Sequence, residues 1–371
     1  MSVTKGLATL EVEQTYARAR ALCAQVGETP QLVPTLWGLW RFYCGQGVLP
    51  TARELGEQLV RLAEREAVPT QRLQAHEALG TTLAYLGDYT AARAHLEQGS
   101  RLTDPTVDRT LALREGLAPG VRCLAVAANV LWCLGYPAQA VQRSQDALAL
   151  AQALAHVYSQ GVAQHFAAWL HHRRREVPAV QAQANVLLTL ATTQGFPLHV
   201  AEGTCWQGWA RAMHGEGEAG LAQLHQGQQD LVAIGMELFR PVCLFLLAET
   251  AGHVGQVKDG LRLLSEGLTV LEANGQGDLL AEAYRLQGAF LLYQDVLQTD
   301  QAEACFQQAL TIARRQQAKS WELRVAMSLA RLWQQQGKRA EAYELLAPVY
   351  GWFTEGFDTA DLRRRRRYQT H

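Results

Sequence analysis

The sequence predicts an all-α protein, a solenoid in which antiparallel helix pairs stack with a period of about 40 residues. The main observation is an internal repeat, since residues 220–235 (GLAQLHQGQQDLVAIG) align with residues 260–275 (GLRLLSEGLTVLEANG). The composition agrees, because Ala, Leu, Gln, Glu and Arg dominate and only two isoleucines, Ile234 and Ile312, occur. Such residues favour helices, and the shortage of β-branched residues argues against a sheet.

Small residues recur in register within the predicted pairs. One stands seven positions before the turn in most pairs: Gly38, Gly80, Ala128, Ala168, Gly208, Ala248 and Ala330. Two more stand five and twelve positions after the turn, as Gly220 and Gly227 do after Gly215. A glycine inside a helix costs about 1 kcal/mol relative to alanine. Its recurrence therefore predicts close approach of helices, within a pair and between neighbouring pairs.

The predicted elements follow one another with little interruption. Residues 1–30 are expected to hold one leading helix, an incomplete repeat that ends at Gly27. The solenoid is predicted over residues 31–353, with about eight helix pairs: 31–44 with 51–67, 69–86 with 90–102, 121–134 with 138–154, 156–172 with 178–194, 197–214 with 216–234, 237–254 with 256–273, 278–294 with 300–317, and 319–336 with 338–353. Most turns inside the pairs hold a glycine, which readily adopts the positive φ of a helix C-terminus.

Two segments depart from the repeat. Residues 103–120 contain Asp-Pro and Pro-Gly and add about eight residues to the period, so we expect an inserted loop with a short helical piece. Residues 354–371 follow the last pair and include the arginine run 363–367. This run could bind nucleic acid or an acidic lipid surface, but it lacks an amphipathic pattern. We therefore expect a disordered, solvated C-terminal tail.

Charge and cysteine spacing argue against several classes of partner. The formal net charge is −1, from 34 basic and 35 acidic residues, so we expect neither a nucleic-acid nor a membrane partner. The longest apolar stretch, 124–135, is shorter than the roughly 20 residues of a membrane span. The seven cysteines are irregularly spaced and form no CxxC pair. They are predicted to be buried thiols in a reducing cytoplasm, and not a disulfide frame or a zinc site.

No motif of a catalytic or cofactor site is present in the sequence. It contains no GxxxxGK[ST], GxSxG or HExxH segment. His165 and His172 could share a helix face as metal ligands, but no third ligand is suggested. The segment HHRRRE at 171–176 is more simply a polar helix end, where cations are favourable. We therefore expect no enzymatic activity, no metal ion and no cofactor.

The repeats resemble the tetratricopeptide (TPR) family. The best matching segments are LGTTLAYLGDYTAARAHLEQG (79–99), AANVLWCLGYPAQAVQRSQDAL (127–148) and SLARLWQQQGKRAEAYELLAPVY (328–350). The period here is longer than the family's, and the surplus lies in longer helices and linkers. The resemblance implies a right-handed superhelix, in which one face of each first helix lines a concave groove.

Residues 292–362 are also similar to the C-terminal repeat region of large bacterial signalling proteins. Those proteins join an adenylate/guanylate-cyclase-type head and a STAND-like ATPase module to a C-terminal repeat array. Nothing in this sequence resembles the head or the ATPase module. The resemblance implies a role in signalling and admits an ATPase/cyclase module as a partner.

Two functions from different classes therefore stay open, both in the cytoplasm. The first is a non-catalytic protein–protein interaction scaffold that takes a protein or peptide in its concave groove. The second is a sensory or regulatory arm of a cyclase–ATPase signalling protein, which binds a small ligand or restrains the catalytic modules. The chain as given, without a head, favours the scaffold.

The candidate binding residues lie at fixed offsets from the small residue of each first helix. The resemblance to the TPR family implies that this face lines the groove. They are Tyr85, Asn129, Trp132, His165, Trp169, Arg173, Glu202, Trp209, Phe245, Glu249, Arg285, Tyr293, Arg324 and Arg331. A tryptophan repeated at one register is typical of a binding hot spot. The alternative is that these tryptophans belong to the core, as helical aromatics usually do.

Overall fold

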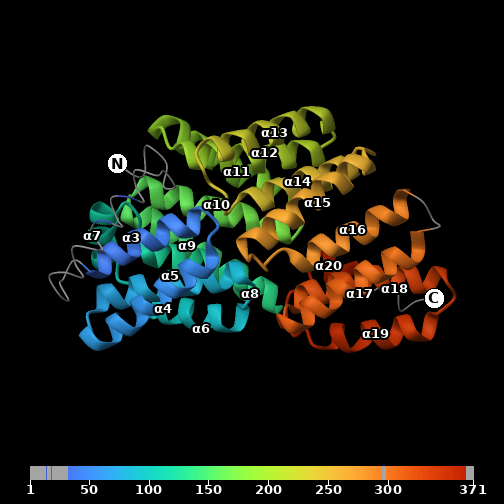
Figure 1. Ribbon diagram of the computed structural model, residues 1–371, viewed down its shortest axis with the longest axis horizontal. Coiled ribbons are helices and arrows are strands. Elements are labelled where there is room, and N and C mark those ends of the chain that lie inside the picture. The colour runs from blue at the N-terminus through green and yellow to red at the C-terminus, as the bar shows by residue number, and fades with distance from the viewer. Residues whose placement is uncertain (1–13, 15–17, 19–31, 295–297, 365–371) are drawn as a thin grey trace.

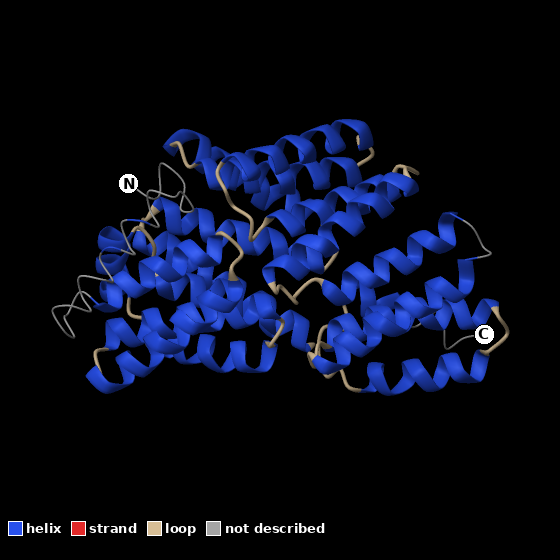
Figure 2. Ribbon diagram, viewed as in Figure 1, coloured by secondary structure: helices blue, strands red, loops and turns tan. Residues whose placement is uncertain are grey.

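The computed structural model describes Gln14, Arg18, residues 32–294 and residues 298–364, and in these parts it contains 18 helices and no strand (Figure 2). The predicted all-α helical-repeat fold is confirmed. Apart from Gln14 and Arg18, the leading helix expected in residues 1–30 lies outside the described residues.

Sixteen of the described helices form eight consecutive pairs. The first helices are α3 (Leu32–Gly45), α5 (Pro69–Leu86), α8 (Pro119–Leu134), α10 (Val157–Arg173), α12 (Pro197–Met213), α14 (Arg240–His253), α16 (Leu280–Gln294) and α18 (Lys319–Gln335). The second helices are α4 (Leu49–Glu66), α6 (Tyr89–Arg101), α9 (Pro137–Leu154), α11 (Val177–Gln194), α13 (Gly217–Ala233), α15 (Val257–Asn274), α17 (Thr299–Arg315) and α19 (Arg339–Gly351). Two short helices, α7 (Pro105–Glu115) and α20 (Ala360–Arg364), lie outside the pairs.

Glycine ends the first helix of most pairs, and the turn after α8 shows how. Gly135 has φ +94°, its N–H donates to the carbonyl of Trp132, and the N–H of Tyr136 donates to the carbonyl of Leu131. This is a Schellman motif, which satisfies the last carbonyls of the helix. Pro137 then begins α9 at a position where a missing N–H costs little. The sequence thus sets the length of each helix and reverses the chain between them.

The small residues lie where helices of a pair touch, as the register predicts. A Cβ atom added at Gly220 of α13 would stand 2.5 Å from the carbonyl oxygen of Gly208 in α12 and 2.8 Å from the backbone nitrogen of Ala212. A Cβ at Gly227 would stand 2.6 Å from the Sγ atom of Cys205. These distances leave no room for a side chain, so glycine permits the close packing of α12 on α13.

The inserted segment after α6 contains a helix of its own. Asp104 caps α7, because its carboxylate accepts hydrogen bonds from the backbone of Thr106 at 2.8 Å and of Val107 at 3.1 Å. Asp108, within α7, is fully buried and accepts from the N–H of Gly120 at 2.8 Å. The insertion is therefore fixed to the start of α8.

The expectation of a disordered tail from residue 354 is wrong for the residues that the structure describes. Residues 354–364 turn back onto the solenoid and end in α20, where Leu362 is only 2 % exposed. Leu362 packs with Phe353, Leu346 and other residues of α18 and α19. Glu355 accepts hydrogen bonds from the backbone N–H groups of Ala138 and Gln139 at the start of α9. The prediction rested on the arginine run and gave no weight to Leu362.

The array curves so that its C-terminal pairs lie against its N-terminal pairs (Figure 1). Ser320 of α18 donates a hydrogen bond to the carbonyl of Trp132 in α8 at 2.5 Å. Trp321 lies edge-on to Trp132, with the two ring centroids 4.7 Å apart. The loop before α16 also reaches across, since Gly277 donates to the carbonyl of Tyr85 at 2.8 Å. The inner side of the curve is therefore largely filled by the chain itself.

One cysteine pair departs from the prediction of buried thiols. Cys205 of α12 and Cys243 of α14 form a disulfide, with their Cα atoms 6.3 Å apart. The two residues stand 38 positions apart, close to one repeat, which brings neighbouring first helices into register. Four of the other cysteines are free, and three of these are buried: Cys44, Cys123 and Cys133.

Within the described residues, no single helix is long and apolar enough to cross a membrane. The helices α7 and α8 reach the required length and hydropathy only as a pair, and that pair is bent by 102°.

A row of cavities on the inner face as candidate binding site

Three cavities lie along the inner face, and the first helices of the pairs supply most of their lining. We call them the histidine, middle and arginine pockets. The histidine pocket has a volume of about 70 Å³ and includes Tyr85, His165, His199 and Glu202 in its lining. The middle pocket, of about 40 Å³, includes Trp169, Arg173 and Phe245. The arginine pocket, of about 240 Å³, includes Trp209, Arg175, Arg285, Arg324 and Arg331.

The three pockets form one row. The histidine and middle pockets meet where Phe239 packs against Trp169, with ring centroids 5.9 Å apart. The middle and arginine pockets share Arg175, Glu249 and Arg324 in their walls. A ligand with several side chains could therefore contact more than one of them.

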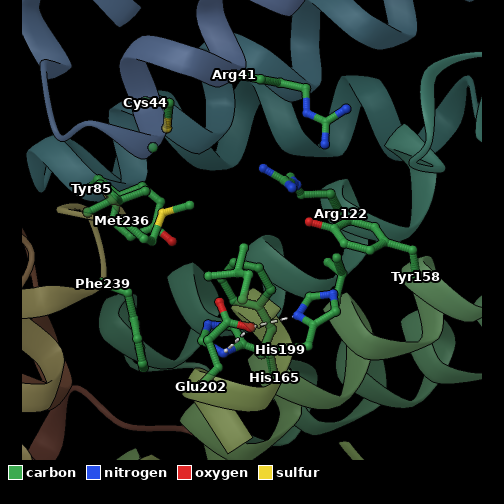
Figure 3. Close-up of a pocket in the computed structure, with 15 residues that line it drawn as sticks. Arg41, Cys44, Tyr85, Arg122, Tyr158, His165, His199, Glu202, Met236 and Phe239 are labelled. Carbon is green, nitrogen blue, oxygen red and sulfur yellow. Dashed lines mark hydrogen bonds and ion pairs between the residues drawn. The ribbon is translucent and has the colours of Figure 1, made fainter. Parts of the chain in front are cut away.

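One wall of the histidine pocket holds a carboxylate between two imidazoles (Figure 3). His199 Nδ1 lies 2.7 Å and His165 Nδ1 lies 3.4 Å from the same oxygen of Glu202. Burial lowers the pKa of His165 to about 4, so this imidazole is neutral at pH 7. Burial alone would raise the pKa of Glu202, but His165 and His199 outweigh it and lower the pKa. The wall therefore presents an ionised carboxylate fixed in place.

The facing wall carries two arginines, Arg41 of α3 and Arg122 of α8 (Figure 3). Arg41 donates to the carbonyl of Glu115 at 2.9 Å. Arg122 lies 3.3 Å from Glu77, which is fully buried and also accepts a hydrogen bond from Trp37 at 2.7 Å. Guanidinium groups opposite a carboxylate give the pocket two charged sides that could orient a polar ligand.

Cys44 also lines the histidine pocket, and its chemistry bears on catalysis. Burial raises the pKa of its thiol to about 12. At neutral pH it is therefore protonated, whereas a nucleophilic cysteine must be a thiolate. The pocket thus offers polar contacts to a ligand and no activated nucleophile at this residue.

Aromatic rings and arginines together line the middle pocket, and Arg173 lies among the rings. The guanidinium of Arg173 lies 4.8 Å from the ring of Trp169 and 5.9 Å from the ring of Trp132. Its Nη2 atom lies 3.7 Å from Asp278, whose pKa is raised to about 6 by burial. Such stacking stabilises a cation away from water. The middle of the row therefore combines aromatic surface with buried charge.

The arginine pocket combines charged groups from five elements. Arg285 of α16 makes two hydrogen bonds of 2.7 Å to Glu282. Glu249 of α14 accepts from Trp209 at 2.9 Å and lies 3.1 Å from His172 Nε2. Burial alone would raise the pKa of Glu249, but His172 and Arg175 outweigh it and hold the pKa at about 2.

Eleven of the fourteen candidate residues line the three pockets. The histidine pocket takes Tyr85, His165 and Glu202, the middle pocket takes Trp169, Arg173, Phe245, Glu249 and Arg324, and the arginine pocket takes Trp209, Arg285 and Arg331 besides Glu249 and Arg324. Most of the eleven are nearly inaccessible, and Trp169 and Trp209 are each 3 % exposed. That degree of burial is what the core interpretation of the tryptophans requires.

Three candidates lie elsewhere. Asn129 is buried between first helices, where its side chain donates to the carbonyl of Phe166 at 3.0 Å. Trp132 is 3 % exposed and packs against Trp321. Tyr293, at the end of α16, is 80 % exposed and lines none of the three pockets.

The lining residues that sequence reasoning missed include Arg41, Arg122, Tyr158, His199, Arg175 and Asp361. For Arg122 a signal was present, because it stands six positions before Ala128, as Glu202 does before Gly208. Arg175 occupies a turn position where other pairs have glycine. Asp361 lies outside the repeats, so the register carries no information about it.

No protein-family model matches the chain, and no curated protein matches it. Solved structures do. A Rap protein complexed with Competence and Sporulation Factor is similar at 10 % identity and a TM-score of 0.61, over 92 % of this chain and 94 % of that one. NprR in complex with its cognate peptide NprX is similar at 12 % identity and a TM-score of 0.55, over 96 % and 92 %. The apo form of the quorum sensor NprR from B. thuringiensis is similar at 14 % identity and a TM-score of 0.51, over 93 % and 95 %.

At these identities the likeness shows the fold alone. The chain is a TPR-like helical-repeat array, as its sequence predicts, and the likeness extends over nearly its whole length.

Proposed function

We propose that this chain is a non-catalytic interaction scaffold in signalling, which binds a peptide or an extended segment of a partner protein along its inner face. The observation that carries the proposal is the row of three adjoining pockets, each of which combines at least one aromatic ring with arginines and one or more carboxylates. A few fixed polar groups in an otherwise apolar, preformed cavity are typical of ligand sites.

Two of the similar structures support this class of ligand. One is of NprR with its cognate peptide, and the other is of a Rap protein with Competence and Sporulation Factor. A helical array that surrounds its ligand can contact it from several repeats, and each repeat then reads one part of the peptide. Three adjoining pockets in one row suit an extended peptide better than a compact metabolite.

Selection of a random peptide library on the immobilised full-length chain tests the proposal. Enriched peptides are then titrated against the chain and against Arg331→Glu, which reverses a charge in the wall of the arginine pocket. We expect affinity to fall at least about tenfold, or 1.4 kcal/mol, because an attractive charge contact is replaced by repulsion.

Arg262→Glu is the matched control, because Arg262 has a side chain that is 64 % exposed and lies outside the pockets. This variant should bind as the unaltered chain does. The proposal fails if no peptide is enriched, or if both variants bind equally well.

The alternative is a sensory arm that binds a small ligand or restrains an ATPase/cyclase module. Its support is the resemblance of residues 292–362 to the repeat region of such proteins, together with the small volume of the histidine pocket, about 70 Å³. A thermal-shift screen against common metabolites separates the two functions. A metabolite that raises the melting temperature, with no enriched peptide, would favour the sensory arm.

For both functions we propose a cytoplasmic location. Free buried cysteines such as Cys44, Cys123 and Cys133 are usual in a reducing compartment. The disulfide between Cys205 and Cys243 argues the other way. Mass spectrometry of protein alkylated directly in cells decides the matter, since a fully oxidised Cys205–Cys243 pair would contradict the cytoplasmic location.

A further inference from the structure

The turn between α10 and α11 differs from the other described turns inside pairs. At the corresponding place those turns have a glycine with positive φ, for example Gly135 (+94°), Gly215 (+103°) and Gly255 (+85°). Here the residue is Arg175, with φ +61°. The left-handed conformation is unfavourable for a residue other than glycine. The side chain of Arg175 points into the arginine pocket and is 33 % exposed.

Positive charge is in excess around this pocket. Its lining includes four guanidinium groups, those of Arg175, Arg285, Arg324 and Arg331, and only two carboxylates, those of Glu249 and Asp361. Glu282 adds a third carboxylate nearby, but both of its oxygens bind Arg285. Repulsion between these guanidinium groups affects Arg175, because the charge of Arg324 is the main cause that lowers its pKa to about 10. Burial is the second cause.

Asp361 of α20 is the carboxylate that the C-terminal segment brings to these arginines. One of its oxygens accepts a hydrogen bond from Arg324 Nε at 2.7 Å. The other oxygen, Oδ1, lies 3.5 Å from Arg175 Nε and has no hydrogen bond. Burial alone would raise the pKa of Asp361, but Arg324 and Arg175 outweigh it and keep the pKa low. The distance from Arg175 Nε to Asp361 Oδ1 is thus longer than the N–O distances of a bidentate arginine–carboxylate pair.

The remaining space shows that the pocket can hold more than this one carboxylate. A volume of about 240 Å³ stays open beside Asp361, and Trp209, Met213 and Met327 contribute apolar surface to it. Arginine clusters with open apolar space recognise a carboxylate attached to a larger group.

We propose that the arginine pocket is the carboxylate-binding subsite of the inner face, and that Asp361 occupies it from within the chain. The C-terminal segment then competes with any ligand that brings a carboxylate, and the ligand must displace α20. This inference rests on the proposed function, because it assigns one part of the peptide site and the chemistry that this part takes.

The first experiment measures binding in trans. The probe is a fluorescent amidated peptide with the sequence of residues 357–362, so that only side chains supply carboxylates. It is titrated against the full chain and against the variant Asp361→Asn/Leu362→Ala, which releases α20. A tethered segment acts at a millimolar effective concentration. We therefore expect the variant to bind the probe at least about tenfold more tightly than the unaltered chain does.

Two changes locate the site. Adding Arg175→Gly to the α20-released variant should abolish binding, and the fold should tolerate it because glycine suits φ +61°. Adding Arg262→Ala instead should leave binding unchanged. A probe that carries Asp361→Asn and an amidated C-terminus should not bind. If the same peptide binds when its C-terminus is a free carboxylate, then a peptide's terminal carboxylate can supply the group that the pocket recognises. Equal binding by the unaltered and α20-released chains, or retained binding after Arg175→Gly, overturns the inference.

A second measurement needs no variant and separates the inference from the proposed function. Amide hydrogen exchange of residues 360–364 is followed in the full chain while a library-selected peptide is added. Displacement of α20 should accelerate exchange there at least about tenfold, since the segment loses its buried contacts. A selected peptide that binds while exchange in α20 stays unchanged would leave the scaffold function intact and refute the competition.

Discussion

At the scale of single residues, the clearest link from sequence to structure is the set of small residues at which the two helices of a pair touch, which we call the seam. The register of the glycines predicts close helix contacts, and the structure places Gly220 against the backbone of α12. Backbone atoms cannot rotate away as a flexible side chain can. The contact therefore fixes the distance between the two helices, and the repeat reproduces it along the array.

Replacing Gly220 by alanine should destabilise the chain by about 1–3 kcal/mol, because the new methyl group has no free space. Gly351→Ala is the matched control, since a Cβ there meets nothing within 4 Å. That change should be neutral or stabilise by up to about 1 kcal/mol through helix propensity. Urea denaturation of both variants measures the difference. Equal midpoints would show that the seam does not determine packing.

Buried histidines give the chain a predictable response to acid. His76 of α5 is 7 % exposed, and its Nδ1 lies 3.0 Å from that of His95. Burial, followed by His95 and Arg72, lowers the pKa of His76 from 6.5 to about 4. The neutral form is therefore the folded form. Its contribution to stability is fully present above pH 6.5 and is lost as the pH falls toward 4.

His76→Gln should flatten this part of the pH dependence by up to about 3 kcal/mol between pH 6.5 and pH 4, because glutamine gains no proton. The measurement is the free energy of unfolding at several pH values for the unaltered chain and the variant. His225→Gln, which removes an exposed histidine of α13, serves as the control and should leave the profile unchanged. A profile of His76→Gln parallel to that of the unaltered chain would refute the assignment.

At the scale of elements, the sequence predicts the helices well and the segments between them less well. Proline, turn glycines and the 40-residue register place the bounds of most helices within a few residues of those observed. The tail was misjudged because the arginine run suggested a solvated segment. Leu362 makes its contacts with residues that only the folded array brings together. A single leucine in a short polar segment gives no periodic signal that would reveal them.

Leu362→Ala should therefore destabilise the last pairs by about 2–5 kcal/mol, the usual range for a buried leucine. Near the end of a solenoid such a loss frees neighbouring helices first. We expect amide exchange in α18–α20 to accelerate while exchange in α8 and α9 stays slow. The exposed Leu113 of α7 is the control, and Leu113→Ala should cost little. Unaltered exchange in α19 would mean that α20 does not support the end of the array.

At the scale of the whole molecule, the decisive feature is the contact of the C-terminal pairs with the N-terminal pairs, which we call closure. It could not be predicted from the repeats. The register specifies which faces meet between neighbouring pairs. It does not specify that α18 reaches α8, because such contacts join residues about 190 positions apart, such as Trp132 and Ser320. For the same reason, the register predicts which residues lie on the inner face of the first helices. It does not predict that other parts of the chain fill this face. The arginine pocket exists only because α12, α14, α16, α18 and α20 converge on the turn between α10 and α11.

Trp321 is the largest side chain of α18 at its contact with α8, where its ring packs against Trp132 and beneath the guanidinium groups of Arg173 and Arg324. It is 2 % exposed, and truncation to alanine should remove about 3–5 kcal/mol of packing at the contact between the two ends of the array. The small-residue contacts within and between neighbouring pairs are not changed by this substitution. We therefore expect Trp321→Ala to open the array and not to unfold it. Small-angle X-ray scattering should then show a larger radius of gyration, with helix content by circular dichroism nearly unchanged.

Trp333 provides the control, since it lies on the same helix but bonds to Glu303 of α17, within its own end of the array. Trp333→Ala should weaken the C-terminal pairs and leave the radius of gyration unchanged. If closure hides the inner face, Trp321→Ala should also bind a selected peptide faster than the unaltered chain, because the array no longer has to open first. A variant with an unaltered radius and an unaltered association rate would show that the curvature arises within each pair, independently of contact between the ends.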